Sequence, residues 1–462
     1  MNRTRWIVAI AAVLTVVAAA LSYGKRSERR PPIVGIKVTP PVGSGPLAMT
    51  AALSHGMLLV GGDGRVYLDV AMTGSKAEGA RPRVTAALVI DQSDSMRGDK
   101  LENAKLSALR LLEALHDGDR VVLIGFATEV EVLAEATTLR ADTRADLRSR
   151  ILEMQTRDST NIGEALLVAR AQLAKVLDGD GISRVVLISD GVPKKGLMEL
   201  GDFQLLAREN GALGMPITTI GLGLDYNEDI MRAISEHSAA NYYYVKNSGD
   251  LSKAVETEVE ALAATVAKRT QVTLTLAPGV EIDRVFGYPY GAEGRSVTID
   301  VGNVHGGQTR HVVVRLRVPA ETEGERAVTA VEVASDDALG PVRGRRLGAA
   351  LAVIFTRDAE AVRAARNKKV LARVEQVESA ATLDDAMVRY QAGQIEEAQQ
   401  MLQRRLSESS AANQELDDKE LGASNGRLEQ LMNQVNAAPP PSSAAGNDLG
   451  KRAKADAFDL TR

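Results

Sequence analysis

The run VTAALVID (84–91) passes directly into QSDSMRG (92–98). A continuous apolar run of this length is typical of a strand that is buried on both faces of a sheet. The run ends at Asp91, and Ser93 and Ser95 follow at alternate positions. Three oxygen-bearing side chains spaced by two at a strand end indicate either a metal site or a polar turn that caps the next helix.

Apolar strands alternate with amphipathic helices through the surrounding sequence. After 84–91, strands are predicted at 120–127, 184–190, 216–223 and 242–245, and helices at 101–115, 143–154, 162–177, 203–210, 228–238 and 250–265. This alternation predicts an α/β fold with a doubly wound, mainly parallel sheet covered by helices on both faces. Ligands of such sheets bind at the carboxyl ends of the strands, and Asp91 lies at such an end.

Two later segments carry oxygen side chains at comparable places. DSTNIGEAL (158–166) contains Thr160 shortly before a predicted helix, and ISDGVPKKG (188–196) contains Asp190 at the end of a predicted strand. Each segment alone has a local explanation, since Ser159, Thr160 or Asn161 can cap a helix and Asp-Gly can form a turn. Together with the first segment, in this order and at strand ends, they favour a metal site.

The stretch 84–266 resembles a von Willebrand factor A (vWA) domain, which has a Rossmann-like fold. Its D-x-S-x-S, threonine and (S/T)-D-G elements match the metal-ion-dependent adhesion site (MIDAS) of that family. The matching positions are Asp91, Ser93, Ser95, Thr160 and Asp190. The flanking text NIGEAL (161–166) and GLGLDYNEDIM (221–231) is also similar to the family, whereas Ser159 stands where many relatives have glycine.

Hydroxyl and carboxylate oxygens are hard ligands, so we expect a divalent cation, Mg²⁺ in first place and Mn²⁺ or Ca²⁺ as alternatives. The resemblance implies that Ser93, Ser95 and Thr160 bind the ion directly, while Asp91 and Asp190 act mostly through water. It also implies an open coordination position, which an Asp or Glu side chain of a protein partner completes.

The rest of the chain divides by composition and periodicity. Residues 31–46 are rich in Pro and Gly and are predicted to be a linker. Segments with strand patterns lie on both sides of the α/β stretch, and an Ala- and Gln-rich region with helical spacing follows them. We predict a β segment at 47–80 that packs with a β-sandwich-like domain at 269–356, a helical region at 357–435 and a disordered tail at 436–462.

The N-terminus resembles an export signal or an anchor. MNRTRW is followed by fifteen residues (7–21) that are apolar except for Thr15, fewer than the roughly 20 that a full membrane span needs. The basic KRSERR (25–30) favours an uncleaved anchor. We therefore predict a signal peptide or membrane anchor at 1–30 and a place in the cell envelope, periplasmic or membrane-anchored; anchoring on the cytoplasmic side stays open.

Composition excludes several classes of function. The 462 residues contain no cysteine, which excludes disulfides and a thiol nucleophile. The net charge is −4 and no basic stripe is present, so nucleic-acid binding is not expected. The sequence has no GxxxxGK[ST], HExxH or GxSxG motif. We therefore expect a protein without enzymatic activity.

These observations favour a metal-dependent protein-binding module of adhesion or scaffold type. Two alternatives stay open. One is an assembly co-factor that works beside an AAA+ ATPase of the MoxR type, which would place the protein on the cytoplasmic side. The other is a hydrolase that uses the ion as a Lewis acid, for which the sequence offers no positioned nucleophile or general base.

Overall fold

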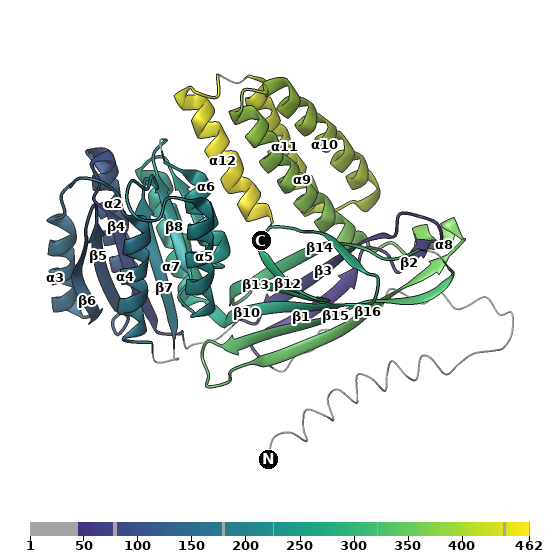
Figure 1. Ribbon diagram of the computed structural model, residues 1–462, viewed down its shortest axis with the longest axis horizontal. Coiled ribbons are helices and arrows are strands. Elements are labelled where there is room, and N and C mark those ends of the chain that lie inside the picture. Colours follow the sequence, from purple (N-terminus) through teal and green to yellow (C-terminus); the bar gives the residue numbers. More distant parts are fainter. Residues whose placement is uncertain are drawn as a thin grey trace, which may run out of the picture. The chain divides into compact units, whose positions relative to one another are not determined.

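The protein is described here by a computed structural model (Figure 1). It describes residues 45–76, 81–177, 181–224, 226–320, 322–437 and 440–461. The predicted signal peptide or anchor at 1–30 lies outside the described residues, as does 31–44 of the predicted linker. Among the helices that are described, none combines the length and the apolar character needed to cross a membrane.

The α/β region contains a sheet whose strand order is β6-β5-β4-β7-β8-β9. Its strands are β4 (Val84–Asp91), β5 (Arg120–Phe126), β6 (Val130–Thr138), β7 (Ile182–Ser189), β8 (Ile217–Leu222) and β9 (Tyr242–Val245). All neighbours pair in parallel except β5 and β6. Every residue of the central strand β4 is buried. The predicted doubly wound, mainly parallel sheet is therefore confirmed, and the antiparallel edge strand β6 is an addition that the sequence pattern did not predict.

Helices cover both faces of this sheet (Figure 1). They are α2 (Asp99–Ala114), α3 (Ala141–Leu152), α4 (Ile162–Ala174), α5 (Leu200–Ala212), α6 (Glu228–His237) and α7 (Ser248–Ala263). Apolar side chains of α2, α3 and α7 pack on one face of the strands. Those of α4, α5 and α6 pack on the other face. Burial of both faces explains why the central strands are continuous apolar runs instead of alternating ones.

Two further sheets enclose a separate apolar core. One has the order β1-β3-β14-β11 and the other β12-β13-β10-β15-β16-β2. Their strands are β1 (Leu47–Leu53), β2 (Met57–Leu59), β3 (Arg65–Gly74), β10 (Thr265–Leu276), β11 (Glu281–Val285), β12 (Tyr290–Glu293), β13 (Ser296–His305), β14 (Thr309–Arg317), β15 (Gly324–Asp337) and β16 (Arg345–Thr356). Because β3 precedes the α/β region and pairs with β14 after it, the α/β region is inserted into the chain of this sandwich.

Helices form the C-terminal part of the chain (Figure 1). They are α8 (Ala359–Ala364), α9 (Lys368–Gln391), α10 (Ile395–Leu416), α11 (Lys419–Asn436) and α12 (Ala444–Leu460). Gly393 separates α9 from α10 with φ +80°, a backbone conformation that favours glycine. Helices α9, α10, α11 and α12 share one apolar core.

The C-terminus differs from the sequence-based expectation of a disordered tail at 436–462, because residues 444–460 form α12. Ser443 caps this helix by accepting a hydrogen bond from the Gly446 amide. Ala453 and Ala457 are buried in the helical core, and Phe458 joins the core of the α/β region. The apolar residues of this segment are few, so its composition resembled that of a disordered tail. Packing of these residues on two neighbouring domains stabilises the helix.

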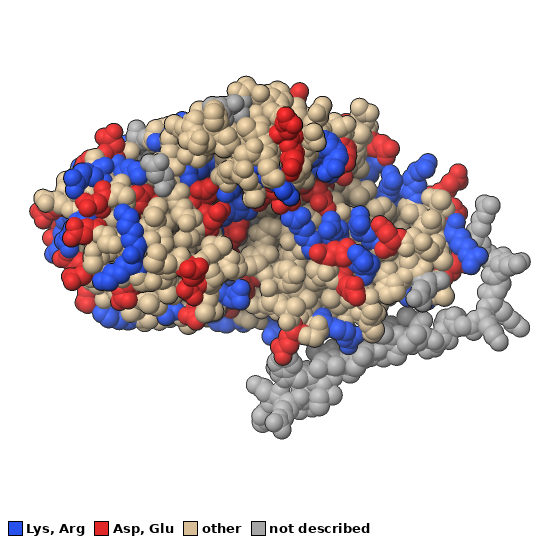
Figure 2. Space-filling model, turned by 45° about the horizontal axis from the view of Figure 1, so that its top comes forward, with Lys and Arg blue, Asp and Glu red and all other residues tan. Residues whose placement is uncertain are grey.

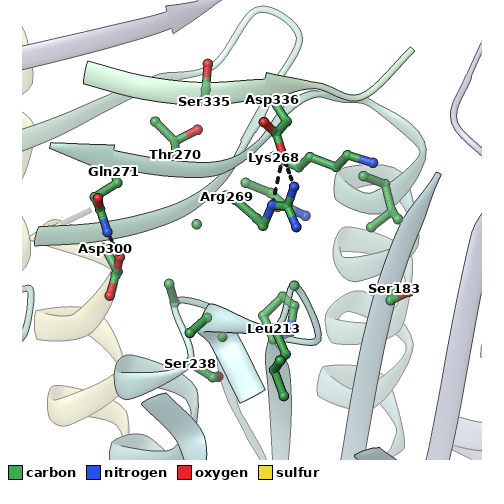
Figure 3. A pocket seen from close by; sticks show the side chains of 18 of the residues that line it. Ser183, Leu213, Ser238, Lys268, Arg269, Thr270, Gln271, Asp300, Ser335 and Asp336 are labelled. Atoms are coloured by element: carbon green, nitrogen blue, oxygen red, sulfur yellow. Dashed lines mark hydrogen bonds and ion pairs between the residues drawn. The ribbon is translucent and has the colours of Figure 1, made fainter. Parts of the chain in front are cut away.

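A cavity of about 380 Å³ lies where the α/β region meets the sandwich, and Figure 3 shows side chains that line it. The first residues of β7 and Pro216, which precedes β8, line it, together with parts of β10, β13 and β15. Arg269 and Asp336 form an ion pair on its wall. The Lys268 ammonium donates to the carbonyl of Gly181 at 2.8 Å and so ties β10 to the start of β7. This cavity lies at the amino ends of the parallel strands, opposite to the end at which Asp91 stands.

Candidate metal centre

The first loop of the candidate site begins where β4 ends. Asp91 is fully buried, and one of its carboxylate oxygens, Oδ1, accepts a hydrogen bond from the Ser93 amide at 2.8 Å. The hydroxyls of Ser93 and Ser95 lie 3.0 Å apart. A short 3₁₀ turn and Gly98, with φ +78°, then lead into α2. The three side chains are thus held together by a tight turn with a glycine at its end.

The second loop carries Thr160 immediately before α4. Asn161 is the residue that caps this helix, since its side-chain oxygen accepts from the Glu164 amide at 3.3 Å. The Asn161 amide donates to the carbonyl of Ala127 at 2.9 Å, which places the loop at the end of β5. Thr160 is therefore not needed as a cap. Its hydroxyl is buried and has no hydrogen-bond partner among the described residues.

The third loop follows β7 and joins the other two. The Ser189 hydroxyl donates to Oδ2 of Asp91 and accepts from the Gly191 amide at 2.8 Å. Farther along the loop, the amides of Lys194 and Lys195 both donate to the carbonyl of Thr160, at 2.9 and 3.0 Å. Hydrogen bonds therefore connect the loops that carry Asp91, Thr160 and Asp190 at one edge of the sheet.

The electrostatics of the site are dominated by two buried carboxylates. Burial raises the pKa of Asp91 to about 6, and the negative charge of Asp190 adds to this effect, while hydrogen bonds from Ser189 and Ser93 oppose it. One oxygen of Asp190, Oδ2, lies 3.2 Å from the ammonium of Lys100. Its other oxygen, Oδ1, is buried and has no hydrogen-bond partner in the described part of the chain.

These features fit a hard divalent cation. A buried hydroxyl and a buried carboxylate oxygen without partners are costly, and a cation satisfies both. Within the described ranges, no group of three or more His, Asp or Glu side chains is placed to hold a metal. The donors available are therefore hydroxyls and two carboxylates, which suit Mg²⁺ better than a softer metal. The assignment of the five residues as the ion's site stays a prediction.

Sequence reasoning missed two residues that shape the site. Ser189 bridges Asp91 to the third loop, and its place directly before Asp190 in ISDG was the available signal. Lys100 pairs with Asp190 although the two residues are 90 positions apart. A lysine in the first turn of an amphipathic helix reads as a solvated side chain, so the sequence carried no signal for this contact.

Comparison with known proteins supports the fold. Residues 87–257 match the family model of the von Willebrand factor type A domain. The chain is 25% identical over 199 residues to the protein YfbK of Escherichia coli, an alignment that covers 43% of this chain and 34% of YfbK. The chain thus spans about a third of the length of that relative.

Two solved structures resemble a larger part of the chain. A von Willebrand factor type A protein from Catenulispora acidiphila superposes with a TM-score of 0.68 at 16% identity, covering 85% of this chain and 90% of that one. The ArnB paralog VWA2 from Sulfolobus acidocaldarius does so with a TM-score of 0.55 at 20% identity, covering 89% and 99%. At these identities the likeness concerns the fold.

Proposed function

The chain contains a von Willebrand factor type A domain, and from this premise we propose that the domain binds a protein partner through a divalent cation. Domains of this type generally mediate protein–protein interactions. The observation that carries the proposal is a pair of buried oxygens, Thr160 Oγ1 and Asp190 Oδ1, that have no hydrogen-bond partner among the described residues and lie in the loops joined to the buried Asp91 carboxylate. Buried oxygens without partners are costly, and a cation bound to them removes that cost.

Each residue of the proposed site has a role that its position supports. The hydroxyls of Ser93, Ser95 and Thr160 are the proposed direct ligands, and Asp91 and Asp190 are proposed to hold ordered water and supply negative charge. The bound ion, Mg²⁺ in first place, supplies an electrophilic centre for one further oxygen ligand. We propose that an Asp or Glu side chain of the partner is that ligand.

The rim of the site supports an acidic partner. Lys194 and Lys195 are exposed, and their amides are anchored on the carbonyl of Thr160. A partner that approaches the ion therefore meets two cationic side chains, which favour encounter with negatively charged surfaces. On the face drawn in Figure 2, basic and acidic side chains are interspersed, unlike the footprint of a nucleic-acid-binding surface.

We propose binding without catalysis. The residues around the ion site offer oxygen ligands and a lysine that is paired with Asp190. Turnover would require a nucleophile or general base aimed at a substrate. We assign the hydroxyls of the site to the ion and not to a nucleophile, so the domain is proposed to bind its partner without reacting with it.

The test is a pull-down from envelope extract with the full chain as bait, in Mg²⁺ and in EDTA. Thr160→Ala is expected to lose the partner that wild type retains in Mg²⁺ and releases in EDTA, because the variant lacks a ligand hydroxyl. Thr160→Ser restores the hydroxyl and is expected to retain the partner. Equal recovery of the same partner in EDTA, or by Thr160→Ala, would contradict the proposal. Recovery of a MoxR-type ATPase would assign the domain to assembly instead of adhesion.

We also propose that the protein resides in the cell envelope, on the strength of the basic and apolar N-terminal residues 3–21. Cell fractionation of the full chain is expected to recover it with membranes or periplasm. A variant with Val13→Glu and Val16→Glu interrupts the apolar run and is expected to shift the protein to the cytosol. Recovery of the wild type in the cytosol alone would show that the proposal is wrong.

A further inference from the structure

Lys100 occupies an unusual position for a lysine. It lies in the first turn of α2, where the helix dipole is unfavourable for a positive charge. Its side chain is 24% exposed and its ammonium lies 3.2 Å from Asp190 Oδ2, whereas the Asp190 side chain is 2% exposed. Among ion pairs between described residues, Lys100 provides the only cation that contacts either carboxylate of the site.

The neighbouring loop holds the lysine in this position. Gly223 follows β8 with φ +81°, and a Cβ atom there would lie 3.1 Å from Cε of Lys100. The backbone of this loop therefore packs directly against the aliphatic stem of Lys100. A side chain at position 223 would push the stem away, so the close approach and the ion pair belong to one local arrangement.

If the proposed function is right, Lys100 sets the net charge of the site once a metal ion is bound. With both aspartates ionised, the two carboxylates and the ammonium leave one net negative charge. A divalent cation turns this into one net positive charge, which a single partner carboxylate neutralises. Without the lysine, the loaded site would already be neutral, and a carboxylate would bring an uncompensated negative charge.

We propose that Lys100 makes the metal-loaded site selective for a carboxylate ligand, at the expense of affinity for the metal itself. This inference rests on the proposed function, since it concerns the same ion and the same partner group. In the absence of metal, the ammonium neutralises Asp190 and competes with the cation. When the metal ion is bound, the same ammonium repels the ion but attracts the anionic ligand.

The proposal predicts opposite changes in two affinities. In Lys100→Gln, the Kd of Mn²⁺ is expected to fall about tenfold, as estimated for a divalent and a monovalent charge about 6 Å apart in a water-like medium. The concentration of acetate that half-saturates the Mn²⁺-loaded protein is expected to rise about threefold, because the attraction between two monovalent charges at that separation is half as large. Both quantities are measured by water-proton relaxation, because bound Mn²⁺ relaxes its water ligands and acetate displaces water.

Two further variants separate charge from structure. Lys100→Arg keeps the charge and is expected to keep both affinities within about twofold of wild type. Lys105 lies in the same helix and pairs with Glu102 at 2.9 Å. Lys105→Gln therefore removes a lysine away from the site and is expected to leave both affinities unchanged.

The outcomes distinguish this inference from the proposed function. Opposite shifts in Lys100→Gln, absent in Lys105→Gln, support the role of Lys100. Parallel loss of both affinities would overturn it by showing that Lys100 merely holds the loop, and unchanged affinities would overturn it as well. Failure of the wild type to bind Mn²⁺ at all would overturn the proposed function, and this inference with it.

Discussion

Asp91→Asn is expected to weaken Mg²⁺ binding about 100-fold and, without the ion, to raise the free energy of unfolding by about 1–3 kcal/mol at pH 7.5. The first effect follows because the site loses one of its two carboxylates. The second follows because the fold buries the Asp91 carboxylate and, among the described residues, no cation is paired with it. The same substitution is thus expected to damage the proposed function and to stabilise the metal-free fold.

The sign of the stability effect follows from the pKa of Asp91, which burial raises from 3.8 to about 6. A folded state with a raised carboxyl pKa holds the proton more tightly than the unfolded chain does. The destabilisation is therefore absent below pH 3.8, grows as the pH rises from 3.8 to about 6, and is complete above that. Asparagine carries no charge at any pH, so Asp91→Asn removes this destabilisation.

Urea unfolding at pH 7.5 and at pH 4, in EDTA and in saturating Mg²⁺, measures these effects. Asp91→Asn is expected to be more stable than wild type in EDTA at pH 7.5 and similar to it at pH 4. In saturating Mg²⁺ at pH 7.5, the wild type is expected to gain up to about 2.7 kcal/mol more stability from the ion than the variant does, because its affinity is about 100-fold higher. Asp94→Asn is the matched control, because Asp94 lies in the same loop but is exposed. A variant less stable than wild type in EDTA at pH 7.5 would contradict the argument.

Glu228→Gln is expected to lower the free energy of unfolding by about 2–3 kcal/mol at pH 7. Glu228 begins α6 and accepts from the ammonium groups of Lys451 and Lys454 of α12, at 2.6 and 3.1 Å. Both lysine side chains are at most 6% exposed. Glutamine leaves two buried ammonium groups with weaker partners, although Lys451 keeps the Tyr226 carbonyl and Lys454 keeps Asp229.

The pH dependence gives a second measure of this contact. Burial would raise the pKa of Glu228, but the charges of Lys454 and Lys451 outweigh burial and lower it from 4.5 to about 2. A lowered carboxyl pKa contributes stability above pH 4.5 that is lost as the pH falls toward 2. The difference between wild type and Glu228→Gln is therefore expected to shrink below pH 4.5.

Urea unfolding and limited proteolysis of α12 are the measurements. Glu397→Gln serves as control, because Glu397 forms an exposed ion pair with Arg389 and is expected to change stability by less than about 0.5 kcal/mol. A Glu228→Gln protein as stable as that control, with α12 equally resistant to protease, would show that the contact between α6 and α12 contributes little.

Local periodicity accounts for the part of the fold that the sequence predicted. A strand buried on both faces must be apolar throughout, and β4 is so at every position up to Asp91. The strand β6 has a different environment at the sheet edge, where its residues are half-buried or exposed. Its pattern was weaker for that reason, and it was not predicted.

The candidate site was predictable to the extent that its residues occur in short motifs. Asp91, Ser93 and Ser95 share one turn, and Thr160 and Asp190 each lie beside a predicted element. The identity of the α4 cap was not predictable, since Ser159, Thr160 and Asn161 are all suitable residues. Only the backbone geometry assigns the cap to Asn161 and leaves Thr160 Oγ1 without a partner among the described residues.

The sequence by itself determined the alternation of strands and helices and the oxygen side chains at the strand ends, because both depend on residues that are close along the chain. The tertiary structure decided what those side chains meet. The bond from Ser189 to Asp91 spans 98 residues, the ion pair of Lys100 with Asp190 spans 90, and the contact of Lys451 with Glu228 spans 223. Such contacts depend on how elements pack, and packing leaves no periodic signal in a single sequence.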